Sequence, residues 1–300
     1  MAHLNYKHLR YFWMVAKSGS IVKAGEQLFL SPQSISGQLG ELESSLGVKL
    51  FKRVGRGLEL TETGHQVYSY AEEIFALGNK LMEVVQNEEG RRVNPFRVGI
   101  VSTVPKTVAF RVMESVLHLA DPVRLICREG KLADLLAEMA VHRLDMVIAD
   151  RPKPTNLNIR AFNHFLGESP VSIMGSRKLI EALPSKPFPE VLNQAPFLIP
   201  SEDFAIHASL MQWFQSNRIS PKFTGIFDDS ALLKLFGQGG AGFFIASSAM
   251  KNYVQDRYQV EEIGSIDSIK EQLFAITAER QLKHPAVMAV AEATKQIFPS

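Results

Sequence analysis

The sequence predicts an α/β protein in which an N-terminal, all-α winged helix-turn-helix precedes a domain built on an open, doubly wound sheet. The apolar spacing of the first sixty residues is typical of three short helices, and two short strands follow them. From Phe96 onward, short apolar runs alternate with segments of helical periodicity, as in a sheet of parallel strands covered by helices. The 300 residues also exceed the usual size of one domain.

Apolar positions and capping residues delimit the three N-terminal helices. We expect buried stripes formed by Leu9, Phe12, Trp13 and Ala16, then Ile21, Ala24, Gly25 and Leu28, then Ile35, Leu39, Leu42 and Leu46. Ser20 is the expected N-cap of the second helix. Ser31 caps the third, with Pro32 at its first position, and Gly47 ends it. A tight turn between the second and third helices makes a helix-turn-helix.

The exposed face of the third helix carries small polar side chains at its N-terminus. These are Gln33, Ser34, Ser36, Gly37 and Gln38. The positive end of a helix favours phosphate, and glutamine can bind adenine through two hydrogen bonds, so this face suits the major groove of DNA. A polar face that only meets solvent is the alternative interpretation.

After the third helix, we expect a β-hairpin with strands at about Lys49–Arg53 and Leu58–Leu60. Lys52, Arg53 and Arg56 on such a wing would lie along the phosphate backbone. Residues 1–60 hold eight basic residues against four acidic ones, whereas acids prevail in residues 61–90, so one end of the chain is suited to a polyanion. An ordinary exposed hairpin and a chance charge imbalance are the alternatives.

Composition excludes several classes of protein. Hydrophobic content of 46% and charged content of 21% are ordinary for a globular protein, and no apolar run is long enough to span a bilayer. The N-terminus lacks the pattern of a secretory signal, which favours the cytoplasm. Cys127 is the only cysteine, so intrachain disulfides and thiolate metal clusters are excluded. Because it falls in a predicted strand, we expect a buried, inert thiol.

The N-terminal motifs resemble the DNA-binding domain of LysR-type transcriptional regulators. The resemblance covers residues 6–64 and includes SGS, SPQSIS, LFKR and LTETG. It implies base contacts from Gln33, Ser34 and Gly37. The wider DNA-binding set that it implies is Ser31, Pro32, Gln33, Ser34, Ser36, Gly37, Gln38, Lys52, Arg53 and Arg56. The chain departs from the family in having Gly25 where a second alanine is usual, and SPQSIS in place of the common order.

A long amphipathic helix is expected after the wing, with Thr61 as N-cap. Its stripe consists of Val67, Tyr70, Ala71, Ile74, Leu77, Gly78, Leu81, Val84 and Val85. The resemblance implies that this helix pairs with a second subunit; packing against the chain's own C-terminal domain is the alternative. The predicted domains are a winged helix-turn-helix (1–60), a linker helix (61–90) and a regulatory domain (91–300).

The C-terminal part is similar to LysR-type regulatory domains, which implies a two-lobed fold like that of periplasmic binding proteins. The expected strands are FRVGIV, VRLICR, LDMVIAD, FLIP and GFFIA, and QLFAITAER returns the chain to the first lobe. Lobe I is expected at about 95–163 and 269–300, and lobe II at about 164–268. The effector residues implied by the resemblance are Ser102, Thr103, Gly130, Lys131, Pro200, Ser201 and Phe227. Singly, each is also consistent with a simple turn residue.

Within this family, the sequence most resembles the sodium-responsive activators of sodium/proton antiporter genes. The segments involved include PQSISGQL, LDMVIAD, KPFP and FDDSALLKLFG. This resemblance implies Na⁺ or Li⁺, and pH, as the signal; Asp228 and Asp229 are candidate oxygen ligands, although the metal ligands remain unknown. A small organic metabolite is the alternative effector. The implied partners are an interrupted palindrome of double-stranded DNA, RNA polymerase and further copies of the chain, as a homodimer or homotetramer, with no membrane.

An enzyme and a free solute-binding protein are the alternatives of another class. GQGGAG (237–242) follows a predicted helix and precedes a strand, which is the reverse of a dinucleotide-binding loop. The sequence holds no Walker loop, HExxH motif or nucleophile elbow. The missing secretory signal and the basic N-terminal region disfavour a solute-binding protein. We therefore predict a regulator with no catalytic residues and no cofactor.

Overall fold

The computed structural model describes residues 4–54, 57–87, 94–157, 159–279 and 284–298. The chain divides into two compact units, Met1–Arg92 and Val93–Ser300. Within the described ranges, no helix combines the length and the apolar character needed to cross a membrane.

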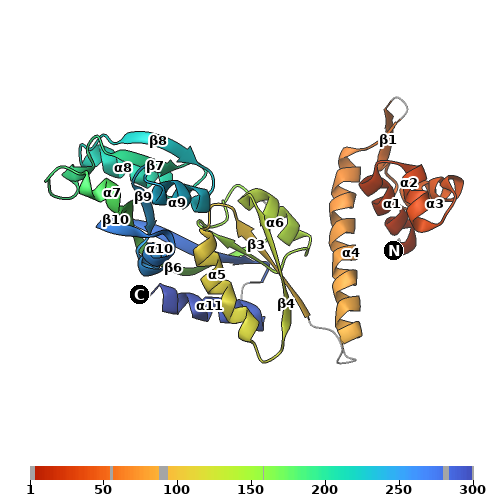
Figure 1. Ribbon diagram of the computed structural model, residues 1–300. Coiled ribbons are helices and arrows are strands. Elements are labelled where there is room, and N and C mark those ends of the chain that lie inside the picture. The colour runs from red at the N-terminus through yellow and green to blue at the C-terminus, as the bar shows by residue number, and fades with distance from the viewer. Residues whose placement is uncertain (1–3, 55–56, 88–93, 158, 280–283, 299–300) are drawn as a thin grey trace. The chain divides into compact units, whose positions relative to one another are not determined.

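The first unit consists of short helices, a β-hairpin and one long helix (Figure 1). Its elements are α1 (Tyr6–Ser18), α2 (Ile21–Leu28), α3 (Pro32–Leu46), β1 (Phe51–Val54), β2 (Gly57–Leu60) and α4 (Glu62–Asn87). This order confirms the predicted winged helix-turn-helix.

The helix ends of the first unit lie where the capping residues predict them. The hydroxyl of Ser20 accepts a hydrogen bond from a first-turn amide of α2, and the hydroxyl of Ser31 accepts one from the Ser34 amide. Pro32 occupies the first position of α3, and Gly47 ends this helix with a left-handed backbone, φ 70°. Local sequence thus sets the length of the helices.

The core of the first unit comes mostly from the predicted stripes. Its buried side chains are Leu9, Tyr11, Phe12, Val15, Ala24, Ile35, Leu39, Leu42, Leu50 and Ala71. Trp13, Ile21 and Leu28 of the predicted stripes are half-buried against this core, whereas Ala16 is half-buried without joining it and Leu46 is exposed, so the predictions for Ala16 and Leu46 are wrong. Helix α1 turns Tyr11 and Val15 inward instead, and Leu46 is the last residue of α3, beside the exposed Gly47 turn.

The first wing strand begins later than predicted. β1 and β2 pair antiparallel, with Phe51 opposite Leu60 and Val54 opposite Gly57. Lys49, which was expected in the first strand, precedes it. The reason is that the amides of Leu50 and Phe51 both donate to a carboxylate of α3.

The second unit is an α/β domain in which strands and helices alternate (Figure 1). Its first part contains β3 (Asn94–Val101), α5 (Lys106–Glu114), η1 (Ser115–His118), β4 (Val123–Gly130), α6 (Leu132–Ala140), β5 (Met146–Ala149) and β6 (Phe162–Ser176). Its middle part contains α7 (Arg177–Glu181), η2 (Glu190–Leu192), β7 (Pro196–Pro200), α8 (His207–Ser216), β8 (Lys222–Phe227) and α9 (Ser230–Gln238). It ends with β9 (Phe244–Ser247), η3 (Ser248–Met250), α10 (Lys251–Tyr258), β10 (Val260–Thr277) and α11 (Pro285–Ile297).

A six-stranded sheet of order β4-β3-β5-β10-β6-β9 runs through both lobes. In lobe I, β3 lies between β4 and β5 and is parallel to both, which is the arrangement of a doubly wound sheet. The long strands β6 and β10 pair antiparallel with each other. β10 also pairs with β5 of lobe I, and β6 pairs with β9 of lobe II. Lobe II adds the parallel pair β7 and β8. The predicted fold class is confirmed, while the predicted lobe boundaries, which fall inside β6 and β10, stay a prediction.

The five predicted strands are all present, but their pairing differs in part from the prediction. β9, which was expected to be parallel, pairs antiparallel with β6. β6 and β8 were not predicted from the sequence. β6 contains Gly167 and Pro170, residue types that disfavour a central strand, and Pro170 lies at a register shift opposite Lys270.

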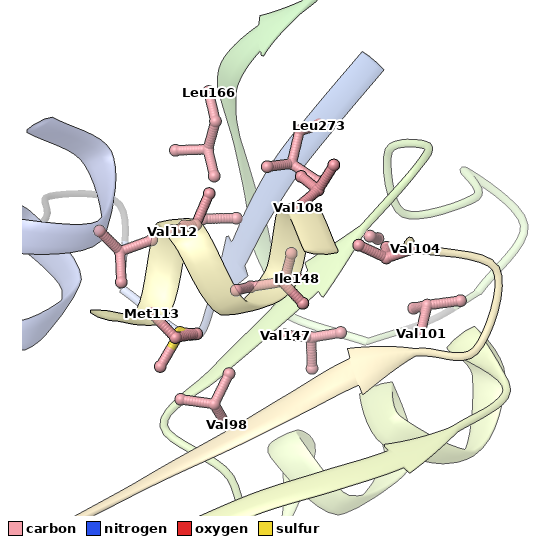
Figure 2. Close-up of a cluster of buried hydrophobic side chains, with 14 of the residues drawn as sticks. Val98, Val101, Val104, Val108, Val112, Met113, Val147, Ile148, Leu166 and Leu273 are labelled. Atoms are coloured by element: carbon pink, nitrogen blue, oxygen red, sulfur yellow. The ribbon is translucent and has the colours of Figure 1, made fainter. Parts of the chain in front are cut away.

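The core of lobe I lies between its sheet and α5 (Figure 2). Figure 2 shows these side chains converging from β3, the turn that follows it, α5, β5, β6 and β10: Val98, Val101, Val104, Val108, Val112, Met113, Val147, Ile148, Leu166 and Leu273. A second buried cluster, which includes Phe197, Leu210 and Phe243, fills lobe II.

The predicted buried position of Cys127 is wrong, because its side chain is exposed on β4. β4 is one of the two edge strands of the six-stranded sheet, and several of its residues face solvent. The partial burial that remains raises the pKa of the Cys127 thiol, so the group stays protonated at neutral pH. The expectation of an unreactive thiol therefore rests on its pKa and not on burial in the core.

Candidate nucleic-acid interface and interlobe cavity

The N-terminal turns of α3 present a polar, uncharged face. Gln33, Ser34, Ser36 and Gly37 are exposed, while Pro32 and Gln38 are half-buried. The first turn of α3 holds no acid, and the exposed Glu41 further along lies 3.4 Å from the His8 ring on α1. The Ser31 hydroxyl accepts from the Ser34 amide at 3.2 Å, which leaves its own proton free to donate. This face can therefore bind phosphate and contact bases as the sequence predicts.

Two of the three cationic wing residues predicted from the sequence lie among the described residues. Lys52 and Arg53 are both exposed on β1 and, as neighbours in a strand, point to opposite faces. Lys52 Nζ lies 3.5 Å from Glu59 Oε2 across the hairpin, so a DNA phosphate would compete with this carboxylate. Arg56 lies outside the described residues.

Glu43 fastens the wing to α3. One of its carboxylate oxygens accepts from the amides of Leu50 and Phe51 at 2.8 and 3.2 Å, and the other lies 2.6 Å from Lys49 Nζ. Burial tends to raise the pKa of Glu43, but the hydrogen bonds from Lys49, Leu50 and Phe51 outweigh burial and lower it. This contact was not predicted from the sequence.

The turn between α2 and α3 contains a residue in an unusual conformation. Phe29 has a left-handed backbone, φ 55°, and its side chain is 94% exposed. In the preceding helix, a Cβ on Gly25 would lie 2.7 Å from the Leu30 carbonyl oxygen. This close approach accounts for glycine at position 25, since an alanine methyl group would require the Leu30 carbonyl to shift.

Helix α4 packs one side against the rest of the first unit and leaves its other side exposed. Thr61 is its N-cap, as predicted: the Thr61 hydroxyl accepts from the Gly64 amide at 2.9 Å and donates to the Lys49 carbonyl at 2.8 Å. Ala71 of the predicted stripe is buried. The exposed apolar residues of the helix are Tyr70, Leu77, Leu81, Met82 and Val85, and the side chain of Val84 lies outside the described residues. Such an exposed stripe suits a second helix.

The predicted effector residues form two groups, one in each lobe. In lobe I, the Ser102 amide donates to the Gly130 carbonyl at 3.1 Å, which joins the turns after β3 and β4, and these turns also contain Thr103 and the exposed Lys131. In lobe II, the Ser201 amide donates to the Phe227 carbonyl at 2.9 Å and joins the ends of β7 and β8 beside Pro200. Both groups lie at the carboxyl ends of parallel strands, where ligands of such sheets bind.

A cavity of about 30 Å³ lies between the lobes, with room for water-sized groups. Its lining consists of Pro105, Thr107, Val108, Pro200, Phe204, Ile206, Ser230, Leu233, Lys234, Ile245, Ala246, Ser247, Met250, Val254 and Glu271. Of the residues predicted from sequence, Pro200 belongs to this lining. The polar lining residues that were not predicted from the sequence are Thr107, Ser230, Lys234, Ser247 and Glu271.

Two opposite charges line this cavity. Lys234 is only 5% exposed, and its ammonium group donates to the Ser230 carbonyl at 3.1 Å. Burial lowers the pKa of Lys234, and the carboxylates of Glu271 and Asp229 act against this shift. Burial raises the pKa of Glu271, and Lys234 and the Ser247 hydroxyl act against that shift. Each charge thus stabilises the other in a site that disfavours both.

Polar contacts cross from one lobe to the other around the cavity. Lys106 of α5 contacts the carboxylate of Glu129 and lies 3.8 Å from Asp229 Oδ2, at the start of α9. On the other side, the Ala205 amide donates to Asp150 Oδ2 at 3.0 Å. Because these contacts join charged and polar groups of the two lobes, a change of charge in the cleft would alter how the lobes are held together.

Lys234 was not predicted as a site residue because α9 buries this lysine and exposes apolar side chains instead. The helix buries Ser230, Leu233, Lys234 and Gly237. It exposes Leu232, Leu235 and Phe236, the three positions that an apolar stripe would have placed in the core. The available signal was a single lysine within SALLKLFG, four residues after a serine. A helix that exposes apolar residues and buries a lysine is an indicator of function.

The two candidate cation ligands, Asp228 and Asp229, directly precede α9. Asp228 is exposed, while Asp229 is the N-cap of α9, with Oδ1 accepting from the Leu232 amide at 2.6 Å. In the described part of the chain, no group of three His, Cys, Asp or Glu residues has the arrangement of a metal site. The segment GQGGAG leads from α9 into β9, with Gly240 at φ 80°, and is a helix-to-strand turn as predicted.

Two family models match the chain and together account for nearly all of it. Residues 6–65 match the bacterial regulatory helix-turn-helix protein of the lysR family. Residues 89–299 match the LysR substrate binding domain. The first match covers the α3 face and the wing, and the second covers both lobes and the cavity.

A curated relative and solved structures agree with these matches. The chain is 37% identical over 293 residues to the transcriptional activator protein NhaR of Escherichia coli, covering 97% of this chain and 95% of that protein. ArgP of Mycobacterium tuberculosis has the same fold, with a TM-score of 0.67 at 15% identity, over 98% of this chain and 97% of the other. Full-length CbnR complexed with its target DNA matches with a TM-score of 0.64 at 16% identity, over 98% and 99% of the two chains.

Proposed function

The chain belongs to the LysR family of bacterial transcriptional regulators, and we propose that it activates ion-stress genes by binding an interrupted palindrome as an oligomer. Its similarity to an activator over nearly the full length supports activation, and because the matched families consist of regulators, the enzyme alternative is set aside. Because the proposed partners are DNA and RNA polymerase, we place the protein in the cytoplasm. The observation that carries the proposal is the exposed, acid-free N-terminal face of α3, with Lys52 and Arg53 on the adjoining wing.

In this proposal, Gln33, Ser34 and Gly37 contact bases, and Ser31, Ser36, Arg53 and Arg56 contact phosphates. Gln33→Ala should weaken binding to the operator by about 1–3 kcal/mol while binding to random DNA persists. Gln66→Ala, which truncates an exposed glutamine of α4, is the matched control and should leave both affinities unchanged. Equal losses of Gln33→Ala on operator and random duplex would refute base contact by Gln33.

The oligomer forms, in this proposal, through the exposed stripe of α4. Tyr70, Leu77 and Leu81 are more than half exposed in the chain alone, and a two-fold pair of such helices would hold two DNA-binding units for two half-sites. Leu77→Glu with Leu81→Glu should therefore dissociate the oligomer and weaken operator binding. Sedimentation at several protein concentrations measures this effect.

The signal that we propose is Na⁺ or Li⁺, modulated by pH, with a small effector in the cleft biasing the arrangement of the lobes. The support is the resemblance of the whole chain to the sodium-responsive activators and the identity to NhaR. The test is a titration of operator binding and promoter output with Na⁺ against K⁺ at fixed ionic strength, since any basic DNA-binding protein responds to salt. Identical responses to both ions would exclude sodium as the signal.

A further inference from the structure

Two separate contacts hold α4 against the rest of the first unit. At the start of the helix, the Thr61 hydroxyl donates to the Lys49 carbonyl oxygen at the base of the wing, at 2.8 Å. Further along, the indole N–H of Trp13 on α1 donates to Glu72 Oε1 at 3.2 Å. The rise of an α-helix places Thr61 and Glu72 about 16 Å apart. Two anchor points at this separation fix the direction of α4 relative to α3 and the wing.

Trp13 lies at the centre of the second contact. Its ring centroid is 5.1 Å from that of Phe75, three residues after Glu72, and the ammonium group of Lys17 lies 4.9 Å from the Trp13 centroid. The Tyr68 hydroxyl also donates to Glu72 Oε1, at 3.2 Å, so one carboxylate oxygen accepts from both helices. We refer to Trp13, Lys17, Tyr68, Glu72 and Phe75 as the α1–α4 joint.

Helix α4 continues well beyond this joint (Figure 1). From Phe75 to Val85 it rises by about 15 Å. Its exposed apolar residues in this part are Leu77, Leu81, Met82 and Val85. In the proposed oligomer, this part of the helix contacts a second copy of the chain. A rotation at the joint would therefore move one DNA-binding surface relative to the other.

The spacing of two half-sites depends on the same angle. One added base pair moves a half-site by about 3.4 Å along the duplex and turns it by about 34°. To reach half-sites with a wrong spacing, the two DNA-binding surfaces must rotate relative to α4, and this rotation breaks the joint. The free energy of the joint thus adds to the cost of a wrong spacing, once in each subunit.

We propose that the Trp13–Glu72 hydrogen bond restricts the dimer to one spacing of its two half-sites. The inference rests on the proposed function, because it requires that two copies paired through α4 bind two half-sites. Neither side chain contacts a base in this proposal. Trp13 and Glu72 are positioning residues, and they act through the placement of α3 and the wing on the duplex.

Spacing variants of one duplex test this role with the full-length protein. The probe is a palindromic duplex that the wild type selects from a random pool, with one or two base pairs added or removed between its half-sites. Glu72→Ala deletes the acceptor. The ratio of affinities for the best spacing and for its neighbours should then fall about threefold to tenfold, as expected for the loss of one hydrogen bond. Affinity for a duplex with a single intact half-site should stay unchanged.

Three further variants separate the hydrogen bond from a general effect on α4. Trp13→Phe removes the indole donor but keeps a ring beside Phe75, and it should lower the ratio as Glu72→Ala does. Glu72→Gln keeps an acceptor oxygen and should largely retain the ratio. Glu73→Ala truncates the neighbouring half-buried acid and should leave the ratio unchanged. An unchanged ratio in Glu72→Ala, or an equal fall in Glu73→Ala, overturns the inference.

A measurement without DNA tests the joint itself. The loss of melting temperature in the double variant Trp13→Phe, Glu72→Ala should be smaller than the sum of the two single losses, and additive losses would overturn the pairing. If the wild type shows no spacing preference, the proposed binding to two half-sites is wrong, and the role of the joint fails with it. A preference that persists in Glu72→Ala contradicts the role of the joint alone.

Discussion

The N-terminus of α3 and the interlobe cavity both place hydroxyl groups beside the amide ends of helices, but one set is exposed and the other is buried. Ser34 and Ser36 of α3 face solvent. Ser230, at the start of α9, lines the cavity and is buried, and its hydroxyl lacks a hydrogen bond to any described residue. Exposed hydroxyls are hydrated until a ligand arrives, whereas buried ones cost free energy until they are satisfied.

The two sites also differ in how their parts are held together. Glu43 and Thr61 bind α3, the wing and α4 to each other within one unit, through bonds that form without any ligand. The cavity is closed by contacts between two lobes, such as that of Asp150 with the Ala205 amide. The proposed DNA-binding surface is therefore preformed, and the contacts between the lobes are the ones that a ligand in the cleft would change.

The most damaging change to the preformed surface should be Gly64→Ala. A Cβ on Gly64 would lie 2.1 Å from the carbonyl oxygen of Leu50, a backbone atom that cannot move without displacing the wing. We expect a loss of about 3 kcal/mol in the free energy of unfolding, measured in urea. Gly78→Ala on the same helix, where a Cβ would meet no atom within 4 Å, is the control and should be neutral or stabilising. Equal effects would show that the wing is not held at Gly64.

Glu43 should show the next largest effect. Glu43→Ala leaves the Leu50 and Phe51 amides without their acceptor and should cost about 2 kcal/mol, whereas Glu43→Gln, which retains an acceptor, should cost about half as much. Because the pKa of Glu43 is lower in the folded protein than in the unfolded chain, its contribution is present above the unfolded pKa and is lost as pH falls through the folded pKa. Urea melts of wild type and Glu43→Gln from pH 7 to pH 3 should therefore converge; a constant difference would contradict the assignment.

The sequence predicted the first unit better than it predicted the lobes and their cleft. The helices of the first unit were found because caps such as Ser31 and Gly47 and the stripe of α3 are local signals. Cys127 and β6 were misread or missed because edge position and long-range pairing are set by strands distant in sequence.

The cleft was only partly predictable. Turn residues such as Ser102 and Ser201 could be named, since they follow predicted strands, and they remain candidate effector contacts. Lys234 and Glu271 were missed because periodicity assigns apolar residues to the core, and α9 buries its lysine instead. Tertiary packing here overrides the local pattern, and it does so where a charged site is built.

The unsatisfied hydroxyls of the cleft lead to a smaller effect of opposite sign. Thr103→Val removes a buried hydroxyl that has no partner among the described residues, so it should stabilise the ligand-free protein by up to about 1 kcal/mol while weakening the effector response. Thr294→Val is the matched control, since its buried hydroxyl donates to the Val290 carbonyl at 2.7 Å and its loss should destabilise. Calorimetry of both variants decides this point, and destabilisation by Thr103→Val would show that the hydroxyl is already satisfied.

Phe29 should give the smallest effect, and it tests whether the DNA-binding surface is free of strain. Its left-handed backbone is costly for phenylalanine but acceptable for asparagine, and the exposed ring loses little on removal. Phe29→Asn should therefore stabilise the protein by about 0.5 kcal/mol, whereas Phe29→Ala, which cannot relieve the strain, should not. If Phe29→Asn is more stable but binds operator and random DNA less well, then the exposed ring contacts the duplex, because strain that is kept at a cost in stability indicates a functional role. If both affinities are unchanged, the ring has no part in binding, and the preformed surface begins at Ser31.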